Sequence, residues 1–124
     1  MKGLHLLADL WGCERLQPAM VDAAALAALC TASVSSVGLT PVAERFHAFD
    51  PVRAGEPAGV TGVVLLAESH LAIHTWPEQG AVTLDVYVCN LDQDNSAKAR
   101  ALLESLIAAF APQRQHVQAV QRGG

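Results

Sequence analysis

Short runs of alternating apolar and polar residues occupy much of this chain, a pattern typical of strands with one buried face. The clearest run is 81–89, where four apolar side chains point one way and Thr83, Asp85, Tyr87 and Cys89 point the other. The pattern predicts strands at residues 4–11, 39–49, 60–66, 71–75, 81–89 and 116–120.

Two stretches have the composition and spacing of helices. The Ala-rich run 19–32 follows Pro18, which suits the first position of a helix, and Asp22 in its first turn suits the helix dipole. A second helix begins near residues 94–95 and ends before Pro112. Its apolar stripe has helical spacing and consists of Ala99, Leu102, Leu103, Leu106, Ile107 and Phe110.

With 71–75 taken as the continuation of strand 60–66 after a break near residues 68–69, the order of these elements is strand, helix, three strands, helix, strand. Runs of strands between two helices favour an α+β two-layer sandwich, with helices on one face of a mostly antiparallel sheet. A chain of 124 residues suits a single domain, residues 1–124. The face of the sheet without helices would need another cover, which favours a homodimer.

Composition narrows the possible function classes. Apolar residues make up 52% and charged residues 16%, so the chain is globular, and a net charge of −4 without a basic block argues against a nucleic-acid partner. No apolar run is long enough to span a bilayer, and the N-terminus lacks a signal-peptide core, so we expect a cytoplasmic protein without a membrane partner. Cys13, Cys30 and Cys89 fit neither a zinc motif nor a disulfide framework.

Chemistry-bearing side chains concentrate in one stretch, residues 68–78, after the apolar run 60–66. Burying a serine, two histidines and two glutamates costs free energy unless each finds a partner, so the stretch is a candidate site. His70, His74 and Glu78 are each four apart, as metal ligands on a helix can be. On a strand, His70 and His74 would lie about 13 Å apart at ~3.3 Å per residue, so we expect hydrogen-bonded strand histidines and no metal site.

Ser69 and His74 could form a nucleophile–base pair, but an unbroken strand places them on opposite faces because their separation is odd. The pair therefore needs a turn or chain break near Ser69, and no G-x-S-x-G elbow is present. Cys89 is most simply a buried thiol. Phe49 and Trp76 are most simply core aromatics, although an aromatic beside a polar cluster can also stack on a ligand.

The scarcity of lysine disfavours one kind of amine chemistry. The lysines are Lys2 at the terminus and Lys98 on the outer face of the second predicted helix. Enzymes that use pyridoxal phosphate need a well-placed lysine for the Schiff base, so amine chemistry here would take its carbonyl from another source.

Several segments of the chain resemble the same protein family. One is the run Glu68-Ser69-His70-Leu71-Ala72-Ile73-His74-Thr75-Trp76-Pro77-Glu78, which is followed by Leu84-Asp85 and Cys89. With the segments His5 to Cys13 and Phe46 to Phe49, it resembles the small prokaryotic pyruvoyl-dependent S-adenosylmethionine decarboxylases. The resemblance covers about residues 4–110.

The resemblance implies that this chain processes itself. In that family a serine attacks the carbonyl that precedes it, and the cleaved chain keeps a pyruvoyl group made from that serine. The implied cleavage lies between Glu68 and Ser69 and gives a β chain of residues 1–68 and an α chain of residues 69–124. The pyruvoyl group at Ser69 would be the covalent cofactor, and the assembly would be a homodimer of αβ units.

The resemblance also assigns roles in processing and catalysis. It implies that Thr61 and His74 promote the self-cleavage. It implies that Cys89 donates the proton that quenches the carbanion after carbon dioxide leaves.

The resemblance leaves the substrate open. Glu78 resembles the carboxylate that binds ribose, and Phe49 resembles the ring that stacks on adenine, with Trp76 nearby, which favours S-adenosylmethionine and a place in spermidine synthesis. Asp9 stands where the family has glutamate, and residues 50–58 carry extra length. Glu78 and Asp9 could instead hold the basic group of ornithine or arginine, which relatives of the family decarboxylate. A further alternative is a homologue that is not processed and acts only as a binding module.

Overall fold

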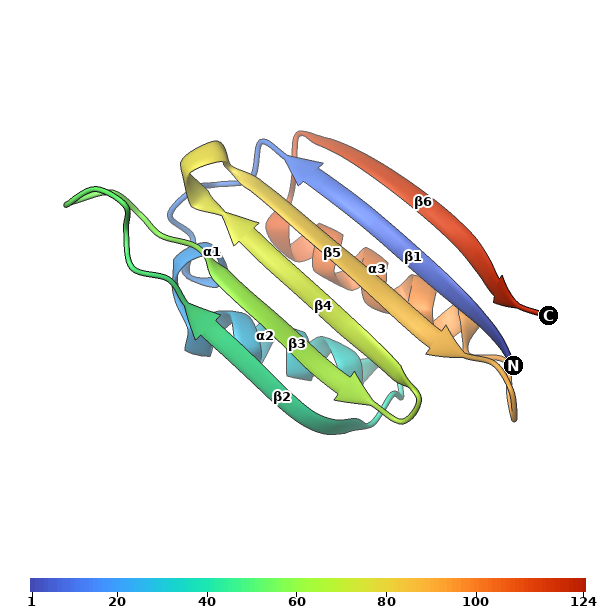
Figure 1. Cartoon of the computed structure of the whole chain (residues 1–124). Helices are drawn as coiled ribbons and strands as arrows, with labels where there is room; N and C mark the ends of the chain where they lie inside the picture. Colours follow the sequence, from blue (N-terminus) through green and yellow to red (C-terminus); the bar gives the residue numbers. More distant parts are fainter.

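The computed structural model describes residues 1–124 as one six-stranded antiparallel sheet with helices on one face (Figure 1). The strands lie in the order β2-β3-β4-β5-β1-β6. They are β1 (Lys2–Trp11), β2 (Pro41–Ala48), β3 (Val60–Leu66), β4 (Ser69–Trp76), β5 (Ala81–Cys89) and β6 (Arg114–Gly123). The helical elements are α1 (Pro18–Val21), α2 (Ala23–Ser36), the 3-10 turn η1 (Pro77–Gln79) and α3 (Ser96–Phe110). This architecture confirms the predicted α+β two-layer sandwich.

The first predicted helix is divided in two at Asp22. This residue has an extended backbone, and its carboxylate accepts a hydrogen bond of 2.9 Å from the backbone N–H of Ala24. Asp22 is therefore the N-cap of α2, and Pro18 begins the separate turn α1. No helix in the structure is long and apolar enough to cross a membrane.

The last strand is longer than its sequence pattern indicates. β6 pairs antiparallel with β1 along its whole length, from Lys2 opposite Gly123 to Trp11 opposite Arg114. All of its residues are exposed because the helices do not reach this edge of the sheet. Backbone pairing to β1 therefore defines β6, because none of its side chains is buried in the core.

One face of the sheet packs on α2 and α3 to form the core. Each inner strand contributes alternate apolar side chains to this face, and the helices contribute their apolar stripes. Full burial of a Leu or Phe side chain contributes about 1.5–3 kcal/mol. The largest fully buried side chains include Leu4, Leu6, Leu10, Leu26, Leu71, Ile73, Leu102, Leu106 and Phe110.

The remaining alternate side chains of each strand point to the second face of the sheet. We call it the open face because no helix of the chain covers it, and it is turned toward the reader in Figure 1. Apolar side chains on it, such as Leu65 and Trp76, are exposed. The polar positions of the inner strands also lie here, namely His5, Asp9, Thr61, His70, His74, Thr83, Asp85, Tyr87 and Cys89. The open face therefore holds most of the candidate functional residues.

Candidate active site

A tight turn joins β3 to β4 immediately before Ser69, and it contains the Glu68–Ser69 bond where the resemblance implies cleavage. Leu66 pairs with Ser69, so the connection consists of Ala67 and Glu68 alone. Glu68 has a φ of 55°, in the left-handed region that residues with a side chain seldom adopt. Holding such a residue there costs on the order of 1–3 kcal/mol. The backbone is thus strained immediately before Ser69.

Cys89 lies beside this turn. Its backbone N–H donates a hydrogen bond of 3.0 Å to Ser69 Oγ, and its Sγ lies 3.8 Å from Glu68 Oε2. The thiol is partly accessible and borders a small hollow of about 290 Å³ that Glu68 also lines. The structure therefore brings Glu68, Ser69 and Cys89 together at one end of β4 and β5.

The other two thiols are poorly suited to proton transfer. Burial raises the pKa of Cys13. Burial also raises the pKa of Cys30, to about 12, and the carboxylate of Glu44 adds to that shift. Both are inert core cysteines, which leaves Cys89 as the thiol available for chemistry.

A second cluster lies at the opposite end of β4. Thr61 Oγ1 and His74 Nδ1 share a hydrogen bond of 2.6 Å across the β3–β4 pair. Both line a pocket of about 540 Å³ together with Phe49, Trp76 and Glu78. Its volume lies within the range of small-molecule sites. The sequence-predicted binding residues Phe49, Trp76 and Glu78 therefore share one pocket with the processing candidates Thr61 and His74.

The loop between β2 and β3 forms the outer wall of this pocket. Asp50, Arg53 and Glu56 contribute charged side chains to the lining. With Glu78, the lining holds three carboxylates and one guanidinium, an acidic balance that favours a cationic ligand. Phe49 is half exposed, so its ring is accessible to a ligand.

Asp9 lies outside this pocket. It is on the open face of β1, in a neighbouring hollow of about 330 Å³ that also includes Trp76 and Thr83. Its register partners are Thr83 on β5 and His116 on β6. Trp76 is the shared wall between Asp9 and the pocket with Glu78.

The two clusters are far apart within one chain. Ser69 begins β4 and His74 is five residues further along it, a separation of about 16 Å at ~3.3 Å per residue. The hydrogen bonds of Ser69 Oγ and His74 go to Cys89 and Thr61, respectively. The turn before Ser69 therefore does not bring Ser69 and His74 together in a single chain.

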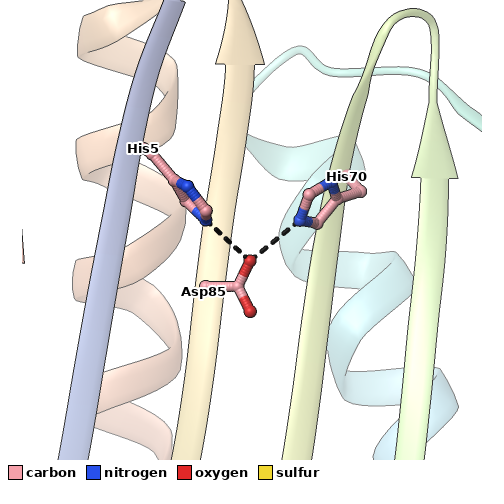
Figure 2. Close-up of side chains that lie close together, drawn as sticks. All are labelled: His5, His70 and Asp85. Atoms are coloured by element: carbon pink, nitrogen blue, oxygen red, sulfur yellow. Dashed lines mark hydrogen bonds and ion pairs between the residues drawn. The ribbon is translucent and has the colours of Figure 1, made fainter. Parts of the chain in front are cut away.

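A third group of polar side chains lies on the open face between these ends (Figure 2). His5 Nε2 and His70 Nε2 lie 2.9 Å and 2.8 Å from the same oxygen, Oδ2 of Asp85. Sequence reasoning considered His70 with His74 and Glu78 and missed this group, because only the strand order brings β1, β5 and β4 side by side. The sequence does give one indication of this group, because the alternation within each strand places all three side chains on the same, polar face of the sheet.

Comparison with known proteins agrees with the fold. A family model described as S-adenosylmethionine decarboxylase matches residues 4–123. The chain therefore belongs to the S-adenosylmethionine decarboxylase family.

Particular relatives are named as proenzymes of that decarboxylase. The Aquifex aeolicus protein is 38% identical over 121 residues, which cover 98% of this chain and 81% of the relative, and one from a Sulfurihydrogenibium species is 37% identical over 121 residues, covering 98% and 82%. The crystal structure of the adenosylmethionine decarboxylase from Aquifex aeolicus superposes with a TM-score of 0.84 at 35% identity, over 98% of this chain and 91% of that one.

Proposed function

We propose that this protein is a pyruvoyl-dependent decarboxylase of S-adenosylmethionine, which makes the aminopropyl donor for spermidine synthesis. The observation that carries the proposal is the Glu68–Ser69 bond, placed in a strained two-residue turn with Cys89 against it. Membership of the family and the names of the relatives support the same activity.

The first proposed reaction is self-cleavage at that bond. Ser69 Oγ attacks the Glu68 carbonyl carbon, and the acyl group moves from the Ser69 nitrogen to its oxygen. Elimination then releases residues 1–68 with a free carboxylate and leaves dehydroalanine, which water converts to the pyruvoyl group and ammonia. The strain at Glu68 favours this path, because breaking the bond frees its backbone from the left-handed conformation.

When formed, the pyruvoyl group supplies a ketone that binds the substrate amine and accepts electrons as carbon dioxide leaves. The residues beside Ser69 fit this role. Cys89 Sγ is partly accessible and placed at the Ser69 end of the strands, where it can deliver a proton to the substrate carbon. The backbone N–H of the same residue holds the Ser69 oxygen in place before cleavage.

The pocket at the other end of β4 is the proposed nucleoside site. Phe49 and Trp76 provide aromatic faces for the adenine, and Glu78 can accept hydrogen bonds from the ribose hydroxyls. The acidic lining suits the positive sulfonium. Ornithine and arginine are also cationic but carry no ring for Phe49 and Trp76 to stack on, so the aromatic pair favours S-adenosylmethionine.

The cluster of Ser69 and Cys89 and the pocket with His74 and Glu78 lie at opposite ends of β4, and we call each a half-site. The two half-sites can form one active site only if two copies combine. The open face lacks a cover, and a two-fold axis between facing sheets, running across the strands, would stack one copy on the other. That axis reverses the strand direction and puts the Ser69 end of one β4 against the His74 end of its partner. We therefore propose a homodimer of αβ units in which each site takes Ser69 and Cys89 from one protomer and Thr61, His74 and Glu78 from its partner.

Intact mass spectrometry of the purified chain tests the proposed activity. We expect masses for residues 1–68 and for residues 69–124 with a pyruvoyl group, and a single uncleaved mass for Ser69→Ala. Carbon dioxide release should follow addition of S-adenosylmethionine but not ornithine or arginine. A wild-type chain that stays whole after long incubation would favour the binding module instead, and turnover of ornithine or arginine alone would reassign the substrate.

A further inference from the structure

His5, His70 and Asp85 form a group that the proposed reaction does not use. They come from three adjacent strands, β1, β4 and β5, and converge on the open face (Figure 2). Their ligand-type atoms, two imidazole Nε2 and one carboxylate oxygen, all lie within 4.8 Å of one another. We propose that this group is a binding site for a divalent transition-metal ion of the zinc class.

The donor set has the chemistry of such a site. Two imidazoles and one carboxylate are common ligands of Zn²⁺ and of first-row ions with similar preferences. In zinc sites nitrogen and oxygen ligands lie about 2.0–2.2 Å from the metal, so atoms sharing one tetrahedral ion are roughly 3.3–3.5 Å apart. The observed distances of 2.8 Å and 2.9 Å from Asp85 Oδ2 approach this value, so small side-chain rotations would admit an ion.

Strand pairing fixes the relative positions of these three side chains. Tyr87 on β5 is the register partner of both His5 on β1 and His70 on β4, and Asp85 lies two residues before it on the same face. The Tyr87 ring packs against both imidazoles, with ring centroids 5.7 Å from His5 and 6.0 Å from His70. The three ligands therefore sit on paired strands and keep their spacing without an ion.

The three side chains can be reached in the single chain. His5, His70 and Asp85 are 20%, 34% and 29% exposed there, so an ion can enter from the open face before a second copy covers it. Three protein ligands leave at least one coordination position for water or another ligand. In the metal-free chain each Nε2–H donates to the carboxylate. Binding requires only that each neutral ring carry its hydrogen on Nδ1 instead.

The direct test is a titration of the untagged full chain, freed of metal with a chelator, with Co²⁺ as a spectroscopic probe for Zn²⁺. We expect one ion per chain, visible ligand-field absorption and no thiolate charge-transfer band. His5→Ala and Asp85→Asn should each weaken binding at least tenfold. His116→Ala removes an imidazole from the same face on β6 and should leave binding unchanged. This readout does not depend on cleavage or decarboxylation, so it can fail while the proposed activity stands.

A second measurement keeps the test decisive if a variant does not fold. The chain has five histidines, and ¹H NMR of the wild-type chain with Co²⁺ should broaden the ring protons of His5 and His70 selectively. Broadening centred on His47, His74 or His116, a thiolate band, or no saturable binding would overturn the proposal. In that case Asp85 acts only as the hydrogen-bond acceptor that orients the two imidazole rings.

Discussion

Glu68 combines an unfavourable backbone conformation with the carbonyl that Ser69 would attack. The two-residue turn requires a positive φ at this position, which glycine adopts without cost. A glutamate here therefore reduces the stability of the uncleaved chain. We infer that the strain persists because it favours cleavage at this bond.

Replacing this residue measures the strain. In a Ser69→Ala background, which keeps the chain whole, Glu68→Gly should raise the free energy of unfolding by about 1 kcal/mol, because the left-handed conformation no longer clashes with a side chain. Urea denaturation gives the value. Ala67→Gly is the matched control, since Ala67 has no positive φ and should lose roughly 0.5–1 kcal/mol. Equal losses for both variants would mean that Glu68 is unstrained.

The proposed roles of the Cys89 backbone and side chain can be tested separately. Cys89→Ala keeps the N–H that holds Ser69 Oγ and removes the thiol, so cleavage should continue while decarboxylation falls by ~10²–10⁴-fold. Mass spectrometry follows the first reaction and carbon dioxide release follows the second. Decarboxylation at the normal rate would show that the thiol is only a packing group.

At the scale of elements, side-chain periodicity predicted most of the sheet but not its far edge. The segment 81–89 could be predicted because its alternation is complete, and β5 has those bounds in the structure. β6 was expected only at 116–120, since its side chains are all exposed and its extent depends on pairing with β1. Asp22 was expected inside a helix, because the sequence offers two start signals, Pro18 and Asp22, and nothing local chooses between them.

The same limit applied to the candidate site. The stretch 68–78 contains several of its residues, and the odd separation of Ser69 and His74 predicted that the two could pair only across a turn or chain break. The group of His5, His70 and Asp85 depends on strand order, which requires contacts between distant parts of the chain. No local pattern carries that information.

The contact between β2 and β3 depends on one glycine. A Cβ at Gly62 would overlap the ring of Phe46 on the neighbouring strand, so Gly62→Ala should cost about 1–3 kcal/mol of unfolding free energy. Thermal or urea unfolding measures the loss. Val63→Ala, next to it on the open-face side of β3, should change stability less, and Phe46→Leu should relieve part of the clash. A neutral Gly62→Ala would show that the ring can move aside freely.

At the scale of the whole molecule, the proposed dimer would account for two features of the single chain. Apolar side chains on it are exposed in one copy, and the Ser69 and His74 clusters lie at opposite ends of β4. A facing copy would cover the exposed apolar side chains. It would also bring the Ser69 cluster of one protomer next to the His74 cluster of its partner. Both features lead to the same two-fold arrangement.

Complementation tests that arrangement. Ser69→Ala and His74→Ala should each stay uncleaved when produced alone. Produced together in equal amounts, they should form mixed dimers with one intact site each, which would restore about a quarter of the wild-type activity. Mass spectrometry should find cleavage only in the His74→Ala chain. If neither chain is cleaved in the mixture, each site lies within a single protomer.

The distance between Ser69 and His74 along β4 also bears on when the protein matures. In a newly synthesised chain the proposed nucleophile Ser69 lies far from the proposed base His74, so processing would wait for two copies to meet. At low concentration the early rate of maturation would then rise with the square of the amount of chain present. The reactive pyruvoyl ketone would then form only in chains that have already dimerised. Chains expressed at a low level would remain as uncleaved precursor.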